Sequence, residues 1–354
     1  MSYGGFIWRV IRINGNGSVR MIYSGTSTDA TGADTSIGTS VYNTKGWDPT
    51  YVGYKYGEDL VLRETSEMSA YHGIGVNNIY YFGKGYEITE DGKFQLDQNQ
   101  DMISGKWADI YKEVIDNYPY SCLRGGAKAD AKCNLIMHVK EYVSDTRANV
   151  HYISYNSKDY ASTLTNKFDS TVKKLVDMWY ENNILNKKDN EGNLLSNYLS
   201  DEIFCNDRSI RSGDGYKLSE FTYYNMYNRM TGTYESTLLC KQNEDKFSVA
   251  NKNLKYPIAL ITADEVMLAG GTGGVNNMFY LYTGQKYWTM SPSFYSTNFH
   301  SSYNYRVTEN GAVGNVNLGS YHGVRPVINL SSEVEISQGI GTKDNPYVVK
   351  LKSS

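Results

Sequence analysis

The chain has 354 residues, of which 40% are hydrophobic and 21% charged, and its net charge is -3. This size and composition predict a folded protein with a large core, as one large domain or two ordinary ones. We expect no nucleic-acid partner and no direct membrane contact. Binding to nucleic acid or to an anionic membrane surface needs a dense cluster of lysine and arginine, and crossing a membrane needs a long apolar segment. The sequence has neither feature.

The chain is expected to begin with a β-hairpin. Residues 6–13 and 18–23 alternate between apolar and polar side chains, and two Asn-Gly pairs at residues 14–17 form a strong turn signal between them. We recognise no signal peptide in the sequence. Residues 24–50 are rich in Gly, Ser, Thr and Asp and are predicted to form a long surface loop.

Aromatic-rich segments at residues 51–56 and 78–82 are predicted to be further strands. The middle of the chain is expected to hold the helices. Apolar residues recur at helical spacing over residues 170–184, with Asp169 or Ser170 as the N-cap, and a second helix is predicted around residues 106–117. Thr262 to Glu265 has the sequence of a capping box before a third, short helix.

The last part of the chain returns to strands. Short segments punctuated by Gly and Asn are predicted to be strands at residues 280–282, 286–290, 305–307, 314–317 and 323–330. No Pro-rich or Gly/Ser-rich linker divides the chain, and no repeat of fixed period is present. We therefore expect one α+β domain with insertions.

The four cysteines leave two alternatives open. Local disulfides Cys122–Cys133 and Cys205–Cys240 would suit an oxidising compartment, whereas four buried thiols would suit any compartment. The spacings do not suit a zinc site, and we expect no metal and no cofactor.

The C-terminal segments carry a resemblance. Trp288-Thr-Met-Ser-Pro292 and Gly323-Val-Arg-Pro-Val-Ile-Asn-Leu330 resemble the closing segment of C-type-lectin-like domains, as in the formylglycine-generating-enzyme branch and the variable proteins of diversity-generating retroelements. The resemblance implies an α+β, C-type-lectin-like fold with a helical insertion. Its closing strand would lie beside Trp8–Ile11, and Arg325 would have a structural role.

On this resemblance, residues 1–354 form a single C-type-lectin-like domain. The helical insertion spans approximately residues 100–260, and the ligand-binding and closing strands span residues 275–350.

A second resemblance covers most of the chain. Phe204–Ser209, Lys255–Glu265 and Tyr280–Gln285 are similar to segments of uncharacterised surface and prepilin-like proteins from gut Firmicutes, and Gly341–Val349 is similar to a phrase at domain edges in Gram-positive surface proteins. This similarity implies an extracellular location, on a bacterial cell surface or a phage particle.

Residues 293–305 and 315–322 are the expected ligand-binding face. They consist largely of Ser, Tyr, Asn, His and Phe, a mixture that combines rigid aromatic contact with adaptable hydrogen bonding, as in antibody loops. The candidate ligand-binding residues are Ser293, Tyr295, Asn298, Phe299, His300, Ser302, Tyr303, Asn304, Tyr305, Asn315, Asn317, Tyr321 and His322.

In retroelement variable proteins, adenine-directed mutagenesis of Asn codons yields Asn, Tyr, Ser, His and Asp just before the closing strand. The resemblance therefore implies that residues 293–322 are diversified. The alternative is a Tyr/Asn/Ser-rich segment without diversification.

The sequence does not favour an enzyme. The formylglycine-generating branch needs cysteines near this region, and none follows Cys240. The pair Asp264-Glu265 is better explained by helix capping, and residues 270–274 by a helix end and turn. Asn206 and Asp207 are candidates for calcium binding, but a turn or an internal ion pair is the preferred interpretation.

These observations together predict a noncatalytic, surface-displayed receptor or adhesin that binds a protein or glycan on another cell or surface. The first alternative is the structural head of a pilin-like subunit, which would self-associate. The second is an enzyme, which would require titratable side chains converging in a deep cleft.

Overall fold

The computed structural model combines helices with two large β-sheets, which confirms the predicted α+β class. It describes residues 1–44, 49–57, 62–65, 79–82, 86–88, 94–96, 151–155, 160–212, 221–233, 235–296 and 301–352. The predicted helix at residues 106–117 lies outside these ranges, as do Cys122 and Cys133.

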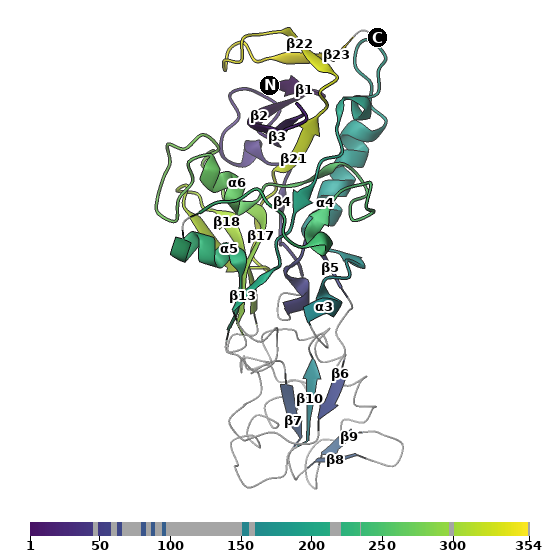
Figure 1. Ribbon diagram of the computed structural model, residues 1–354, viewed down its shortest axis with the longest axis vertical. Coiled ribbons are helices and arrows are strands. Elements are labelled where there is room, and N and C mark those ends of the chain that lie inside the picture. The colour runs from purple at the N-terminus through teal and green to yellow at the C-terminus, as the bar shows by residue number, and fades with distance from the viewer. Residues whose placement is uncertain are drawn as a thin grey trace.

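The first sheet joins the two ends of the chain (Figure 1). Its strands, in spatial order, are β16 (Ile258–Leu260), β21 (Pro326–Leu330), β3 (Val19–Tyr23), β2 (Phe6–Ile13), β1 (Ser2–Tyr3), β23 (Val348–Leu351) and β22 (Val334–Gln338). The predicted N-terminal hairpin is confirmed as β2–β3, and its turn places Gly17 at φ +83°, a conformation that favours glycine.

The second sheet has the order β13 (Ile210–Ser212), β14 (Phe221–Tyr224), β17 (Tyr287–Ser296), β18 (Ser301–Val307) and β19 (Val313–Asn317). Two short strands, β20 (His322–Gly323) and β4 (Thr39–Ser40), extend it beside β17. Met290 N donates a 2.7 Å hydrogen bond to Ile261 O, so β17 is tied to the segment that follows β16 of the first sheet.

The other described strands form smaller sheets. The remaining strand pairs and triplet are β5 (Lys55–Tyr56) with β11 (Phe168–Asp169), β12 (Phe204–Cys205) with β15 (Lys246–Phe247), β8 (Tyr86–Ile88) with β9 (Phe94–Leu96), and β6 (Leu62–Thr65), β10 (His151–Tyr155) and β7 (Ile79–Phe82).

The helices are mostly short. Within the described residues, the α-helices are α3 (Tyr160–Thr163), α4 (Thr171–Tyr180), α5 (Asn225–Asn228) and α6 (Ala263–Leu268). The 3₁₀ turns are η1 (Gly32–Thr35), η2 (Pro49–Val52), η4 (Leu195–Tyr198) and η6 (Asn243–Asp245), and the π-helical turns are η3 (Glu181–Leu185) and η5 (Arg229–Thr233).

Both predicted helix caps are confirmed. The Ser170 side chain accepts a hydrogen bond from Lys173 N at the start of α4, and Thr262 forms a reciprocal capping box with Glu265 at the start of α6. Gly270, at φ +97°, follows the end of α6 as expected.

The core of the first sheet is aromatic. Trp179 of α4 meets Phe6, Trp8 and Tyr23 with ring centroids 5.1, 6.2 and 5.5 Å apart, so α4 covers this face of the β2–β3 hairpin. Since α4 belongs to the predicted insertion, this described part of the insertion shares one core with the strands at both chain ends.

The strand predicted at residues 51–56 is confirmed only at β5, because residues 49–52 form η2. Three further predictions about local structure are wrong. The predicted surface loop at residues 24–50 contains buried residues, because Val41, Tyr42 and Asn43 pass beneath the second sheet and Tyr42 meets Trp288 edge-on at 5.4 Å. Residues 280–282 form a turn instead of a strand, with Tyr282 N bonded to Phe279 O.

The third correction concerns the closing strand. β21 pairs with β3 and not with Trp8–Ile11 of β2, because the hairpin turns β3 inward, between β2 and β21. The structural role of Arg325 is confirmed, since its fully buried guanidinium donates to Tyr23 O (3.0 Å) and Leu281 O (2.9 Å).

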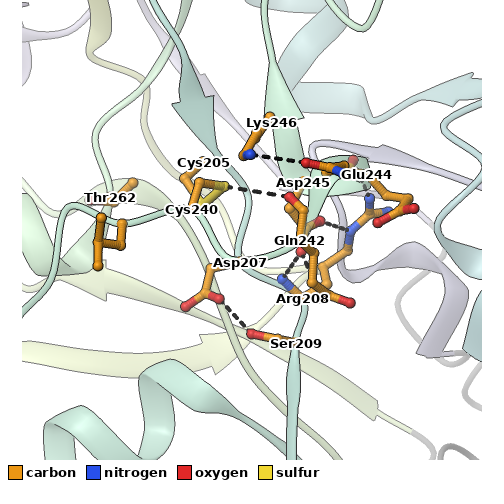
Figure 2. The surroundings of a disulfide bond; sticks show 12 residues. Cys205, Asp207, Arg208, Ser209, Cys240, Gln242, Glu244, Asp245, Lys246 and Thr262 are labelled. Atoms are coloured by element: carbon orange, nitrogen blue, oxygen red, sulfur yellow. Dashed lines mark hydrogen bonds and ion pairs between the residues drawn. A yellow bond between two sulfur atoms is a disulfide. The ribbon is translucent and has the colours of Figure 1, made fainter.

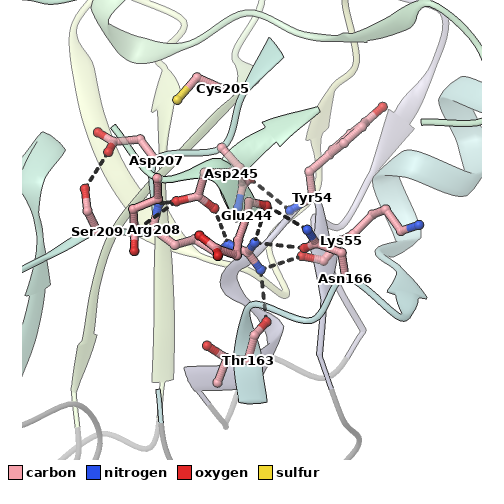
Figure 3. A network of polar contacts seen from close by, with 12 residues as sticks. Tyr54, Lys55, Thr163, Asn166, Cys205, Asp207, Arg208, Ser209, Glu244 and Asp245 are labelled. Atoms are coloured by element: carbon pink, nitrogen blue, oxygen red, sulfur yellow. Dashed lines mark hydrogen bonds and ion pairs between the residues drawn. The ribbon is translucent and has the colours of Figure 1, made fainter. Parts of the chain in front are cut away.

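A second buried arginine joins segments from three parts of the chain (Figure 3). Arg208 Nε donates to Asp245 Oδ1 (2.7 Å), and its other nitrogens donate to Asn166 Oδ1 and to the carbonyls of Lys55, Thr163 and Glu244. Of the two preferred interpretations of Asn206–Ser209, a turn or an internal ion pair, the ion pair is confirmed, because Asp207, at φ +47°, pairs with Arg229.

Candidate binding face

A row of five aromatic side chains lies on one side of the second sheet. We call it the aromatic face; it consists of Phe221, Tyr223, Tyr227, Phe294 and Tyr303, and each side chain is half-buried.

Strand pairing builds this row. Phe294 of β17 lies opposite Tyr223 of β14 and Tyr303 of β18, and directly paired residues point to the same face of a sheet. The Phe294 and Tyr303 rings stack at 4.4 Å, and Tyr223 lies 5.7 Å from Phe294. Three neighbouring strands therefore present one continuous aromatic surface.

The other two rings extend the row. Phe221 stacks on Tyr223 at 5.5 Å along β14, and helix α5 places Tyr227 4.2 Å from Tyr223. These ring contacts restrain the side chains, so a ligand would meet a surface that is already ordered.

Asparagines border the row on β19. Asn317 lies opposite Tyr303, and Asn315 lies opposite Tyr305. Asn317 is held by its neighbours, since its Nδ2 donates to Ser301 Oγ (2.5 Å) and its Oδ1 accepts from Gly319 N (2.8 Å). Asn315 is exposed. None of these side chains is charged, so the surface offers apolar rings beside neutral amides.

The opposite side of the sheet faces the core. Tyr295 and Tyr224 pack against Val52 of η2, and all three are fully buried. On the side of the aromatic face, Tyr305 is also buried, and burial raises its pKa to about 12.

The ligand-binding residues predicted from the sequence differ in solvent exposure. Buried in the core are Ser293, Tyr295, Ser302, Asn304, Tyr305 and His322. Half-buried or exposed are Tyr303, Asn315, Asn317 and Tyr321, while Asn298, Phe299 and His300 lie outside the described residues.

The role of the six buried residues in ligand contact is therefore corrected. The prediction rested on composition, which does not distinguish a Ser- and Tyr-rich surface from a Ser- and Tyr-rich strand inside a sheet. Residues 287–293 of β17 are all buried, because β16, α5 and α6 contact this strand.

Sequence analysis missed Phe221, Tyr223 and Tyr227. They lie in the segment assigned to the helical insertion, and only the alternation of Phe221, Thr222 and Tyr223 indicated a strand with one aromatic side. Their proximity to Phe294 depends on a strand pairing across more than 70 residues of chain, which periodicity does not reveal.

We compared the chain with known proteins. No family model, no curated protein and no solved structure matches it.

Two further findings concern the described residues alone. They include no group of three His, Cys, Asp or Glu side chains that could hold a metal ion, and no helix that combines the length and the apolar composition of a membrane span.

Proposed function

We propose that this protein is a noncatalytic binding protein whose aromatic face binds a neutral glycan. The observation that carries the proposal is the stacked row that joins Phe221 and Tyr223 of β14, Phe294 of β17 and Tyr303 of β18.

The chemistry of the face suits a sugar. A pyranose ring has apolar C–H faces that pack on aromatic rings, and hydroxyl groups that bond to amides and phenols. Tyrosine and asparagine supply both kinds of contact with few rotatable bonds. A charged ligand would find no opposite charge among the five rings or the bordering Asn315 and Asn317.

The absence of catalysis is part of the same proposal. It is supported by the pairing of the buried carboxylates: Asp245 pairs with Arg208, Asp264 with Arg229, and Glu265 with Arg20. Each of these acids is held in an ion pair by a guanidinium.

A C-type-lectin-like arrangement and an extracellular location are also proposed. The first is supported by a sheet in which β1 pairs with β23 and β3 pairs with β21, so that both chain ends meet in it. The second is supported by the disulfide Cys205–Cys240, since disulfides persist in oxidising compartments.

Diversification, if it accompanies binding, is proposed only for the accessible residues. Substitutions among related strains would then concentrate at Tyr303, Asn315, Asn317 and Tyr321, and would spare the buried Ser293 and Asn304.

A printed array of neutral oligosaccharides tests the proposed function. We expect the protein to bind at least one glycan, and Tyr303→Ala to weaken that binding by about 1–3 kcal/mol, the usual cost of removing an aromatic anchor. Tyr280→Ala is the matched control, because Tyr280 is exposed but lies in the loop before β17.

Equal loss in both variants, or no binding to any glycan, would contradict the proposal. If the protein forms concentration-dependent oligomers, and Tyr303→Ala dissociates them, the result would instead support the alternative function, the structural head of a pilin-like subunit. Thermal unfolding of each variant separates lost contact from lost folding.

A further inference from the structure

A second site lies away from the aromatic face, beside the disulfide. It is a cavity of about 220 Å³ lined by the end of the β2–β3 hairpin, the segments around Cys205 and Cys240, and the start of α6. We call it the arginine cavity. It shares no residue with the aromatic face, so the inference below does not depend on the proposed function.

The disulfide fixes one wall of this cavity. It bonds Cys205 of β12 to Cys240, and residues 237–240 form the wall (Figure 2). Asp207 and Thr262 lie beside the disulfide and also line the cavity.

The carboxylates at α6 are already occupied. Glu265 pairs with Arg12 and Arg20 and accepts from Thr262 N (2.9 Å). Asp264 pairs with Arg229 through two nitrogens and also accepts from Thr237 N (3.0 Å). These acids have little remaining capacity to accept a hydrogen bond from a ligand.

Two of the arginines, in contrast, have N–H donors that no described residue accepts from. Arg12 uses Nε for Asn14 and Nη1 for Glu265, and Arg229 uses Nε and Nη2 for Asp264 and Asp207. Within the described residues, Arg12 Nη2 and Arg229 Nη1 make no hydrogen bond. Guanidinium nitrogens of this kind bind a carboxylate well.

One carboxylate oxygen in the cavity is also without a hydrogen-bond donor among the described residues. Glu202 Oε1 accepts from Asn16 (2.6 Å), Ser18 (3.0 Å) and Ser200 (2.6 Å), but no described residue donates to its Oε2. Three arginines and four acids line the cavity. A ligand carrying only a negative charge would therefore fit it poorly, and one that adds a cation for Glu202 would fit it better.

The rim is apolar. Ile203, Leu238 and Leu239 are 48%, 52% and 74% exposed and line the same cavity. Exposed aliphatic side chains that gather in one place mark an interaction site, and here they border a charged interior.

We propose that the arginine cavity binds a free α-amino acid with an aliphatic side chain. The carboxylate binds Arg12 and Arg229, the ammonium group binds Glu202, and the side chain packs on Leu238, Leu239 and Ile203. The volume is below that of pockets for drug-sized ligands, which suits a molecule of this size.

Isothermal titration of the whole chain with L-leucine tests the assignment. Two analogues each lack one charge: 4-methylpentanoate has no ammonium group, and 3-methylbutylamine has no carboxylate. We expect leucine to bind and each analogue to bind at least about tenfold more weakly, since a hydrogen bond to a charged group is worth roughly 1.5–3 kcal/mol.

Two variants locate the binding. Glu202→Gln keeps an oxygen for Asn16, Ser18 and Ser200, so we expect it to fold normally and to lose about tenfold in affinity for leucine but not for 4-methylpentanoate. Leu239→Ser is expected to weaken both ligands. Met278→Ser, at an 88% exposed residue outside the cavity, is the control and should change neither.

The proposal is overturned if leucine does not bind, if 4-methylpentanoate binds as tightly as leucine, or if Glu202→Gln leaves the affinity for leucine unchanged. Melting temperatures without ligand show whether each variant is folded.

Discussion

Fully buried arginines are the most informative single residues of this protein. Arg20, Arg208 and Arg325 are each at most 1% exposed, and they are stabilised in different ways. Arg20 and Arg208 pair with carboxylates, whereas Arg325 donates to two carbonyls and lies over the Tyr287 ring. Burial lowers the pKa of Arg325 to about 10, so it stays charged at neutral pH.

Arg208 provides the first prediction at this scale. Arg208→Met removes the ion-pair partner of Asp245. Burial raises the pKa of Asp245, and the charge of Arg208 opposes that rise. We expect a loss of about 3–5 kcal/mol in the free energy of unfolding, the usual cost of leaving a buried charge unpaired. Urea denaturation measures it.

The double variant Arg208→Met/Asp245→Leu is the control. Because it leaves no unpaired charge, it should recover much of the lost stability. If it is no more stable than the single variant, the carbonyl contacts of Arg208 outweigh its ion pair.

His322 makes stability depend on pH. Its ring is buried 4.5 Å from Trp288, and neither ring nitrogen has a hydrogen-bond partner among the described residues. Burial, followed by the charges of Arg306 and Lys286, lowers its pKa from 6.5 to about 4, although Glu309 opposes them. The folded protein therefore keeps this histidine neutral under conditions that protonate it in the unfolded chain.

The sign of the effect follows from proton uptake. As the pH falls from 6.5 to 4, the unfolded chain binds a proton at His322 that the folded chain does not bind, so the free energy of unfolding falls by up to about 3 kcal/mol. Denaturation between pH 7.5 and 4 measures the fall. His322→Phe should reduce it, and an identical pH profile in the variant would exclude His322 as the cause.

At the scale of elements, the Cys205–Cys240 disulfide stabilises the segment between β12 and β15. The two cysteines are 35 residues apart in sequence. Replacing both by serine should lower the free energy of unfolding by about 3–4 kcal/mol, because a loop of this length gains much entropy when it is opened.

Calorimetry of the oxidised protein and the double-serine variant would measure that loss. An unchanged melting temperature would contradict it.

Elements with local signals were predictable from sequence. The β2–β3 turn, the Ser170 cap and the Thr262 capping box each depend on a few adjacent residues, and all three are confirmed. Residues 41–43 were not predictable as core, because their burial depends on contact with β17, about 250 residues away. The position of β3 between β2 and β21 was not predictable either, because β3 pairs with a strand about 300 residues away in sequence.

At the scale of the molecule, the candidate site was only partly predictable. Composition pointed to residues 293–322, and Tyr303 of that stretch does lie in the aromatic face. Phe221 and Tyr223 come from another part of the chain, and alternation along β18 sends Ser302 and Asn304 to the core side of the sheet. Sequence identified the residue types of the proposed binding surface, whereas strand pairing selects its members.

Hydrogen exchange with a glycan bound tests the central claim most directly. Using an oligosaccharide retained by the array, the account predicts slower exchange in peptides covering residues 221–229, 287–296 and 301–307, which carry the aromatic face. Peptides covering residues 269–286 should be unchanged. Protection confined to residues 269–286, or to the cavity wall at residues 235–241, would contradict the assignment of glycan binding to the aromatic face.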